Sequence, residues 1–230
     1  MAFTSFRFIV FLVLAAAAYF LTPKRCRWVT LFVANYVFYF ISGGRIFIYL
    51  LATTVTTYLA TVKIGDMAAK NKIAFNEAKA ELDKEGKKAW KAAFAKKKKR
   101  ILIPTLLFNF GILAVLKYSG FVTENLNLLF AKIGIGTELP VFRFLLPLGI
   151  SFYTFQSMGY LIDVYREKQE PERNFCKLAL FISFFPQIVQ GPISRFGTLA
   201  EQLFRANEFS YTRIKFGVQL MLWGAFKKMV

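Results

Sequence analysis

The sequence predicts an all-α protein that crosses a membrane several times, and three observations support that fold class. More than half of the 230 residues are hydrophobic (56%), and 18% are aromatic. The apolar residues form runs close to the roughly 20 residues that a helix needs to cross a bilayer. Charged residues are concentrated between these runs. We predict a single membrane domain over residues 1–230, a helix bundle of about seven spans that include broken or re-entrant segments.

The charge balance is strongly basic, with 31 Lys and Arg against 13 Asp and Glu. In a soluble protein, such an excess would indicate a nucleic-acid partner, because clustered Lys and Arg bind phosphates. Here the basic residues lie between hydrophobic runs, as they do in the cytoplasmic loops of membrane proteins. We therefore expect a lipid bilayer and no nucleic acid as partner.

The chain contains no histidine and only two cysteines. Histidine is the usual general base near neutral pH and the commonest metal ligand, so its absence limits the chemistry of the chain. Cys26 and Cys176 each lie beside a basic cluster, with no second cysteine nearby. We predict neither a disulfide nor a metal site.

The first apolar run, Phe6 to Leu21, is followed by Lys24, Arg25 and Arg27. A secretory signal has its positive residues before the apolar run, so this run is interpreted as a retained helix with its amino terminus outside. The second, Trp28 to Ile41, ends at the "SGGR" turn.

The third run, Ile46 to Val62, carries five threonines. Their hydroxyls can donate to carbonyls of their own helix, so threonine is tolerated in a span. We predict that this run crosses the membrane and packs against neighbouring helices.

The segment Lys63 to Arg100 is a basic insert that holds thirteen Lys or Arg and ends in "KKKKR". Its charge predicts a cytoplasmic location. Gly86 interrupts a modest apolar periodicity, and Trp90 and Phe94 lie four residues apart. This pattern predicts interfacial helices on the anionic leaflet, with Trp90 as an anchor. The alternative is a solvated, partly disordered charge run.

Three further apolar runs follow: Ile101 to Tyr118, Phe144 to Tyr165 and Phe216 to Phe226. A moderately polar segment through Arg143 is predicted to be external. Alternation of the spans places Arg166 to Lys177 inside, and it places every strongly basic loop, Lys227 and Lys228 included, on that same side.

The stretch "FISFFPQIVQGPISRF", residues 181–196, combines an apolar run with prolines, glutamines and an arginine. A helix from Phe175 to Gln190 would be about 24 Å long, shorter than the roughly 30 Å hydrocarbon core. Pro192 disfavours helix at Gly191, so we predict a helix that stops there, inside the membrane. The freed backbone must then face a cavity or a wall of protein.

Polar side chains accompany this break. Gln187 and Gln190 share a helical face, and Arg195 follows as a positive charge. In the preceding run, three residues recur at intervals of seven and are expected to share one helical face: Gly149, Gln156 and Asp163. These groups either line an interior cavity or hold helices together by hydrogen bonds, and the sequence leaves both possibilities open.

Two motifs in this order carry a resemblance to a known family. "LLPLGISFYTFQSMGYLIDVYR", residues 145–166, followed by residues 181–196, resembles the membrane-bound O-acyltransferase (MBOAT) family. The similar branch holds bacterial alginate O-acetyltransferases and teichoic-acid D-alanyl transfer proteins. The final "WGAFKKMV" is similar to the next helix of the family.

The resemblance implies a multi-pass enzyme of the bacterial inner membrane. It would move an acyl group, expected to be acetyl, from a cytoplasmic thioester donor of the acyl-carrier or CoA type; alanyl transfer to teichoic acid is the alternative. The acceptor would be a hydroxyl of an extracytoplasmic polysaccharide, reached through a tunnel or by a partner acyltransferase, and no bound cofactor or metal is implied.

The family's essential histidine, which would act as general base, is missing from this chain. We therefore assign no catalytic residue and expect a truncated chain that is inactive alone. The resemblance gives seven candidates for the tunnel wall: Tyr153, Gln156, Gln187, Gln190, Gly191, Pro192 and Arg195. Arg195 has the alternative of reaching a lipid headgroup.

Two other classes of function stay open on the sequence. A transporter or channel subunit also uses broken helices with interior amides, although paired interrupted helices in matching halves are not evident. In a scaffolding membrane protein, the basic insert would recruit lipid or a partner, and the polar residues would only pack.

Overall fold

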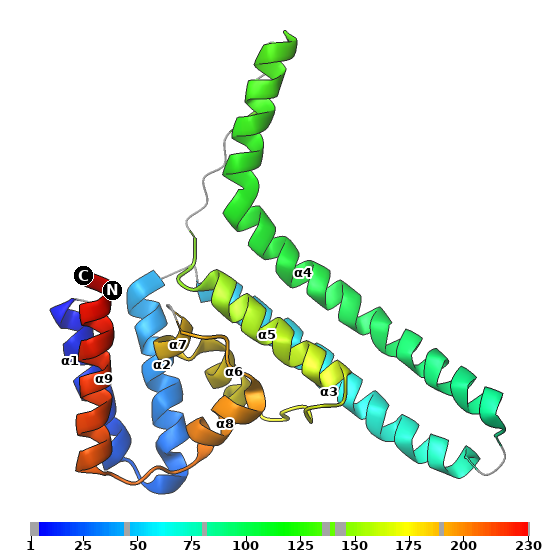
Figure 1. The fold of residues 1–230 in the computed structure, drawn as a ribbon, viewed down its shortest axis with the longest axis horizontal. Coiled ribbons are helices and arrows are strands. Elements are labelled where there is room, and N and C mark those ends of the chain that lie inside the picture. The colour runs from blue at the N-terminus through cyan, green and yellow to red at the C-terminus, as the bar shows by residue number, and fades with distance from the viewer. Residues whose placement is uncertain are drawn as a thin grey trace.

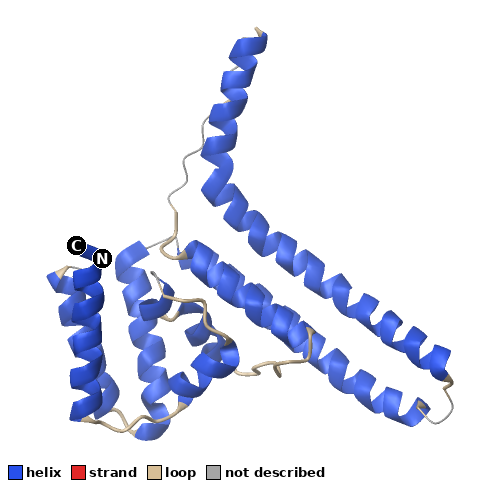
Figure 2. Ribbon diagram, viewed as in Figure 1, coloured by secondary structure: helices blue, strands red, loops and turns tan. Residues whose placement is uncertain are grey.

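A computed structural model describes residues 5–43, 47–79, 82–134, 139–140, 146–188 and 191–229. Within these residues every regular element is a helix, as Figure 2 shows, so the all-α prediction is confirmed. Helices α3 (Phe47–Ala78) and α4 (Lys84–Ile133) are long and apolar enough to cross a bilayer. The predicted number of seven spans stays a prediction.

The first two helices match the predicted runs. Helix α1 (Phe6–Leu21) and helix α2 (Arg27–Gly43) are joined by a short 3-10 turn, η1 (Lys24–Cys26). Lys24 bonds Glu208, and the Arg27 guanidinium donates to the backbone carbonyl of Asn207, so η1 is tied to the loop before the last helix.

Helices α3 and α4 form a long antiparallel hairpin whose tip is the basic insert (Figure 1). At 1.5 Å per residue, α3 is about 48 Å long and α4 about 75 Å long, so each extends beyond a 30 Å core. We call residues 63–100 the basic arm. It is built from the ends of these two helices, and its main part is neither a disordered run nor a set of separate short helices.

Side chains join the two halves of the basic arm. The Trp90 indole donates to Asn71 at 3.0 Å, and its ring lies 6.2 Å from that of Phe75. The prediction that Gly86 interrupts a helix is wrong. Helix α4 begins at Lys84, and the Asp83 carboxylate caps it by accepting the Gly86 N–H at 2.6 Å. Contact of Trp90 with a lipid leaflet stays a prediction.

Helix α4 continues past its predicted end at Tyr118 as far as Ile133, so the predicted end of this helix is wrong. The external location of the polar segment stays a prediction. The polar side chains there do not break the helix, because Thr123 and Asn125 return hydrogen bonds to carbonyls of their own helix. Gly134, in the left-handed conformation at φ +80°, ends it.

Helix α5 (Ile150–Tyr165) packs along α3. Buried hydroxyl residues of both helices line this contact, and they donate to the carbonyl four residues earlier: Thr54 at 2.8 Å, Thr61 at 2.9 Å and Ser157 at 2.8 Å. The predicted bond back to the helix is confirmed for Thr54 and Thr61, whereas the Thr57 hydroxyl is buried without a partner. Small hydroxyl side chains let two helix backbones approach closely.

Helices α6 (Phe175–Ser183), α7 (Phe185–Ile188) and α8 (Phe196–Phe204) form a re-entrant segment. Its two ends lie together, since the Lys177 ammonium is 5.1 Å from the Phe204 ring and 5.9 Å from the ring of Trp28, which follows η1. The segment enters the bundle and returns to the same end, so a broken helix is confirmed here, and its re-entry into a membrane stays a prediction.

Because α6 to α8 return, helix α9 (Tyr211–Met229) runs from the η1 end to the end where α1 begins, and Figure 1 shows both termini there. The prediction that Lys227 and Lys228 share a side with the other basic loops is therefore wrong. The remaining basic segments do lie together, joined by the ion pairs Asp66–Arg173 at 2.8 Å and Lys98–Glu167 at 2.5 Å.

Candidate functional site

The helix break lies earlier than predicted. Helix α6 ends at Ser183, and Phe184 leaves the helical conformation at ψ 102°. Pro186 explains this position, because in a continuous helix its ring would clash with the carbonyl four residues before it and its nitrogen could not donate. A single helix reaching Gly191 is therefore wrong, whereas a break within the apolar stretch is confirmed.

Asn35 of α2 satisfies the backbone that the break exposes. Its Oδ1 accepts the Phe185 N–H at 2.7 Å, and its Nδ2 donates to the Ser183 hydroxyl. Ser183 in turn donates to the Ala179 carbonyl at 2.6 Å. Asn35 is fully buried, so protein rather than lipid supplies the partners. We did not predict this residue, although an asparagine inside an apolar span was a signal for it.

Gln156 of α5 supports the break from the other side. Its buried Nε2 donates to the carbonyl of Phe181, in the last turn of α6, at 3.0 Å. Carbonyls in the last turn of a helix lack an intrahelical partner, so this contact joins α5 to α6. Of the two possibilities that the sequence left open for Gln156, the contact supports helix packing, and its place in a tunnel stays a prediction.

The start of α5 lies directly against α7. Gly149 has φ +71°, and a Cβ there would overlap the Ile188 side chain, so only glycine fits this position. Gly149 precedes α5 instead of lying on its face, which corrects the predicted stack with Gln156 and Asp163. Asp163 is partly exposed near the end of α5.

Beyond α7 the chain folds back on Gln187. The Gln187 Nε2 donates to the Pro192 carbonyl at 2.7 Å and to the Ser194 hydroxyl. The backbone carbonyl of Gln187 accepts the Gly191 N–H at 2.8 Å. A Cβ at Gly191 would lie 2.8 Å from that same oxygen, which requires glycine. Arg195 is exposed at the start of α8.

The structure thus brings four of the predicted residues together around the break: Tyr153, Gln156, Gln187 and Gly191. Pro192 and Arg195 are exposed, and Gln190 lies outside the described residues. That these residues line a substrate tunnel stays a prediction.

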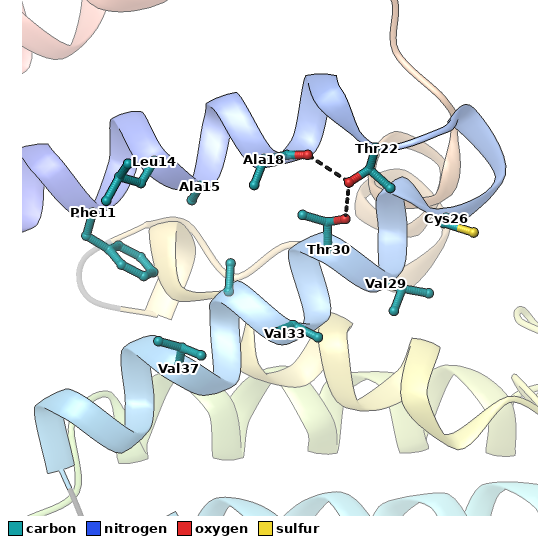
Figure 3. Close-up of a pocket in the computed structure, with 11 residues that line it drawn as sticks. Phe11, Leu14, Ala15, Ala18, Thr22, Cys26, Val29, Thr30, Val33 and Val37 are labelled. Atoms are coloured by element: carbon teal, nitrogen blue, oxygen red, sulfur yellow. Dashed lines mark hydrogen bonds between the residues drawn. The ribbon is translucent and has the colours of Figure 1, made fainter.

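A cavity of about 450 Å³ lies elsewhere, between α1 and α2 (Figure 3). Its lining is almost entirely apolar, from Phe11 on α1 to Val37 on α2, and it contains none of the predicted tunnel residues. At one end Thr30 donates to the Thr22 hydroxyl at 2.9 Å, which in turn donates to the Ala18 carbonyl. The lining also includes the Cys26 thiol and carries no charged side chain.

Lys98 is a further residue that the sequence analysis missed. It lies in the "KKKKR" run, yet it is only 7% exposed, and its ammonium donates to the Tyr165 carbonyl at 2.9 Å and to Glu167 at 2.5 Å. A cation at a helix C-terminus interacts favourably with the helix dipole, so Lys98 fixes the end of α5 to α4. The described residues contain no cluster of three potential metal ligands.

Comparison with known proteins gives three informative relatives. The chain is 32% identical to a probable alginate O-acetylase of Azotobacter vinelandii over 234 aligned residues, covering 100% of this chain and 41% of the relative. It is 31% identical to the corresponding protein of Pseudomonas aeruginosa, covering 100% and 39%. A peptidoglycan O-acetyltransferase of Helicobacter pylori is 31% identical over 155 residues, or 56% of this chain and 28% of the relative.

The chain spans about two fifths of the length of the alginate relatives. No family model matches it, and no solved structure is similar enough to compare.

Proposed function

The chain belongs to the MBOAT-type O-acetyltransferase family, and on that premise we propose that it forms part of an enzyme that acetylates an extracytoplasmic polysaccharide. The observation that carries this proposal is the alignment with alginate O-acetylases over the whole chain. The re-entrant segment α6 to α8 adds support, since broken helices inside a membrane occur where protein or a wet cavity meets them.

The proposed reaction transfers an acetyl group from the sulfur of a thioester to the oxygen of a glycan hydroxyl. The oxygen of a glycan hydroxyl attacks the carbonyl carbon of an acetyl thioester, a C–O bond forms, and the C–S bond breaks. A base takes the hydroxyl proton, which the departing thiolate finally receives. A carrier-protein or CoA thioester is the proposed donor, and alginate or a related polymer, reached directly or through a partner acyltransferase, is the proposed acceptor.

The general base is proposed to come from outside these 230 residues. The chain contains no histidine, and general acid–base catalysis commonly contributes about 10² to 10⁴ in rate. We therefore expect the chain alone to be inactive and to supply the re-entrant part of the site to a longer protein.

The charge distribution supports one orientation in the inner membrane. The η1 turn, the basic arm and residues 166–177 share one end of the molecule, and we propose that this end is cytoplasmic. Both ends of the described chain then lie outside. The thioester donor would approach from the basic end, where the basic arm is proposed to contact the anionic leaflet.

Deleting the gene in its host and measuring the acetyl ester content of the exported polysaccharide tests the proposal. We expect loss of acetyl esters on deletion and recovery with the complete gene product. The re-entrant helices also fit a transporter or channel subunit. Unchanged esters after deletion, together with solute uptake by vesicles that contain the purified protein, would support that alternative.

A further inference from the structure

Four buried side-chain oxygens in the described part of the chain have no hydrogen-bond partner. One is the Thr57 hydroxyl of α3, and the other three belong to residues of α2, α5 and α7, the helices that meet at the break. These three are the hydroxyls of Tyr39 and Tyr153 and the Oε1 of Gln187. Tyr39 is 5% exposed and Tyr153 is 1% exposed. Leaving such a group buried and unpaired is unfavourable, and most buried polar groups in proteins are paired.

The first of these oxygens belongs to α2, beside α7. Tyr39 follows Phe38, whose ring centroid lies 5.0 Å from that of Phe185 in α7. Phe38 and Tyr39 belong to the same buried hydrophobic cluster as Phe185 and Ile188 of α7. Tyr39 therefore lies on the α2 side of the break.

The other two lie on the α5 side and in α7 itself. The Tyr153 N–H donates to the Gly149 carbonyl at 3.0 Å, so Tyr153 is one turn from the glycine that contacts Ile188. Gln187 precedes Ile188 in the chain. Tyr39 and Tyr153 thus lie on the two helices that pack against α7, and Gln187 belongs to α7 itself.

The buried polar side chains that hold the break itself are paired closely, in contrast to these three. Asn35, Gln156 and Ser183 each have a protein partner at this break. The hydroxyl of Tyr160, about two helix turns beyond Tyr153, accepts the Glu172 N–H at 2.7 Å. Lipid tails cannot hydrogen-bond, so they cannot satisfy the three unpaired oxygens.

We propose that Tyr39, Tyr153 and Gln187 form the substrate-binding site of the acyl transfer, an inference that rests on the proposed function. The two tyrosine hydroxyls donate to the carbonyl oxygen of the acyl thioester. Gln187 Oε1 accepts a hydrogen bond from a neighbouring hydroxyl of the glycan, which leaves the proton of the attacking hydroxyl to the general base. Negative charge grows on that carbonyl oxygen as the hydroxyl attacks, so donors placed there bind the transition state more tightly than the ground state.

The variants Tyr39→Phe and Tyr153→Phe test the site in the complete gene product, because each removes one hydroxyl and keeps the ring. Acetyl esters formed on the polysaccharide by isolated membranes are measured per amount of folded protein. We expect kcat to fall on the order of 10²-fold, the usual effect of removing one such donor. The unfolding temperature in detergent should stay the same or rise, because the lost hydroxyl has no protein partner.

Tyr160→Phe is the matched control. It removes a hydroxyl that accepts the Glu172 N–H, so its unfolding temperature should fall while kcat per folded enzyme stays at the wild-type value. Wild-type kcat in both Tyr39→Phe and Tyr153→Phe would overturn the site and leave only ordered water at these hydroxyls. Lowered stability with unchanged kcat would overturn it too, by indicating a structural role. A wild-type protein that transfers no acetyl group would contradict the proposed function itself.

Discussion

Replacing Asn35 with leucine removes the side chain that satisfies the broken helix. The substitution keeps a similar volume and leaves the Phe185 N–H buried without its acceptor. The Ser183 hydroxyl loses the amide of Asn35 but keeps its own bond to a backbone carbonyl. One newly unpaired backbone donor is therefore the main consequence.

The magnitude follows from that count. A buried donor left unpaired costs about 1–3 kcal/mol. A hydrogen bond between helices in a membrane averages about 0.6 kcal/mol when the freed group finds another partner. The Phe185 N–H is buried at the start of α7, where a helix offers no carbonyl of its own to accept it. We therefore expect Asn35→Leu to destabilise the fold by about 1–3 kcal/mol.

Asn109→Leu is the matched control. Asn109 is also a buried asparagine that joins two helices, and it donates to the Thr56 hydroxyl at 3.1 Å. Thr56 retains a hydrogen bond to its own helix at 2.8 Å after the change, so no group is left unpaired. We expect the smaller loss of about 0.6 kcal/mol. Reversible unfolding in mixed detergent micelles measures both variants.

Hydrogen exchange gives a second, local measurement. The Phe185 amide should exchange faster in Asn35→Leu than in the wild type, because its acceptor is gone. Equal destabilisation by the two asparagine variants would refute the reasoning. It would show that water already reaches the break and replaces Asn35, as a wet cavity at this site requires.

The other predictions concern helix junctions and one surface carboxylate. Gly149→Ala should destabilise the fold by at least about 1 kcal/mol, because Gly149 has a positive φ and an added Cβ would overlap α7. In the same unfolding assay Gly159→Ala should be neutral or stabilising, because its Cβ meets open space. Lys98→Met should destabilise the fold by about 1 kcal/mol, because it leaves the partly buried carbonyl of Tyr165 without its partner. Lys97→Met, at an exposed position, should stay within about 0.5 kcal/mol. The pKa of Glu208 is held below its usual range, first by the hydrogen bond from the Lys24 ammonium at 2.6 Å and then by the charge of that ammonium. This ion pair should contribute stability above the ordinary carboxyl pKa and lose it as pH falls through the lowered folded value, and NMR titration should show the pKa of Glu208 rising toward normal in high salt.

Local patterns were sufficient for much of the fold. The apolar runs predicted α1 and α2 close to their observed bounds, and Thr54 and Thr61 of α3 bond back to their own helix as expected. These features depend on neighbours within about one helical turn, which a sequence displays directly. The grouping of three basic segments at one end was also evident from the charge pattern.

Helix lengths were predicted less well where charge replaces apolar residues. The basic arm was interpreted as a change of structure, yet α3 and α4 continue through it. Lysine, alanine and glutamate all favour helix, so the backbone has no local reason to stop where the membrane does. Hydropathy reports the end of a span, and helix propensity decides the end of a helix.

The sequence by itself determined that this chain is helical, belongs in a membrane and breaks a helix within residues 181–196, because composition and proline act locally. Only the tertiary structure decided where the break lies and what it faces. Asn35 is 150 residues from Phe185, whose N–H donates to the Asn35 side chain. The two ends of the re-entrant segment also meet through contacts between residues far apart in the chain. A hydrogen bond between such distant residues leaves no periodic pattern, so the path of α9 and the partners of the break depend on packing.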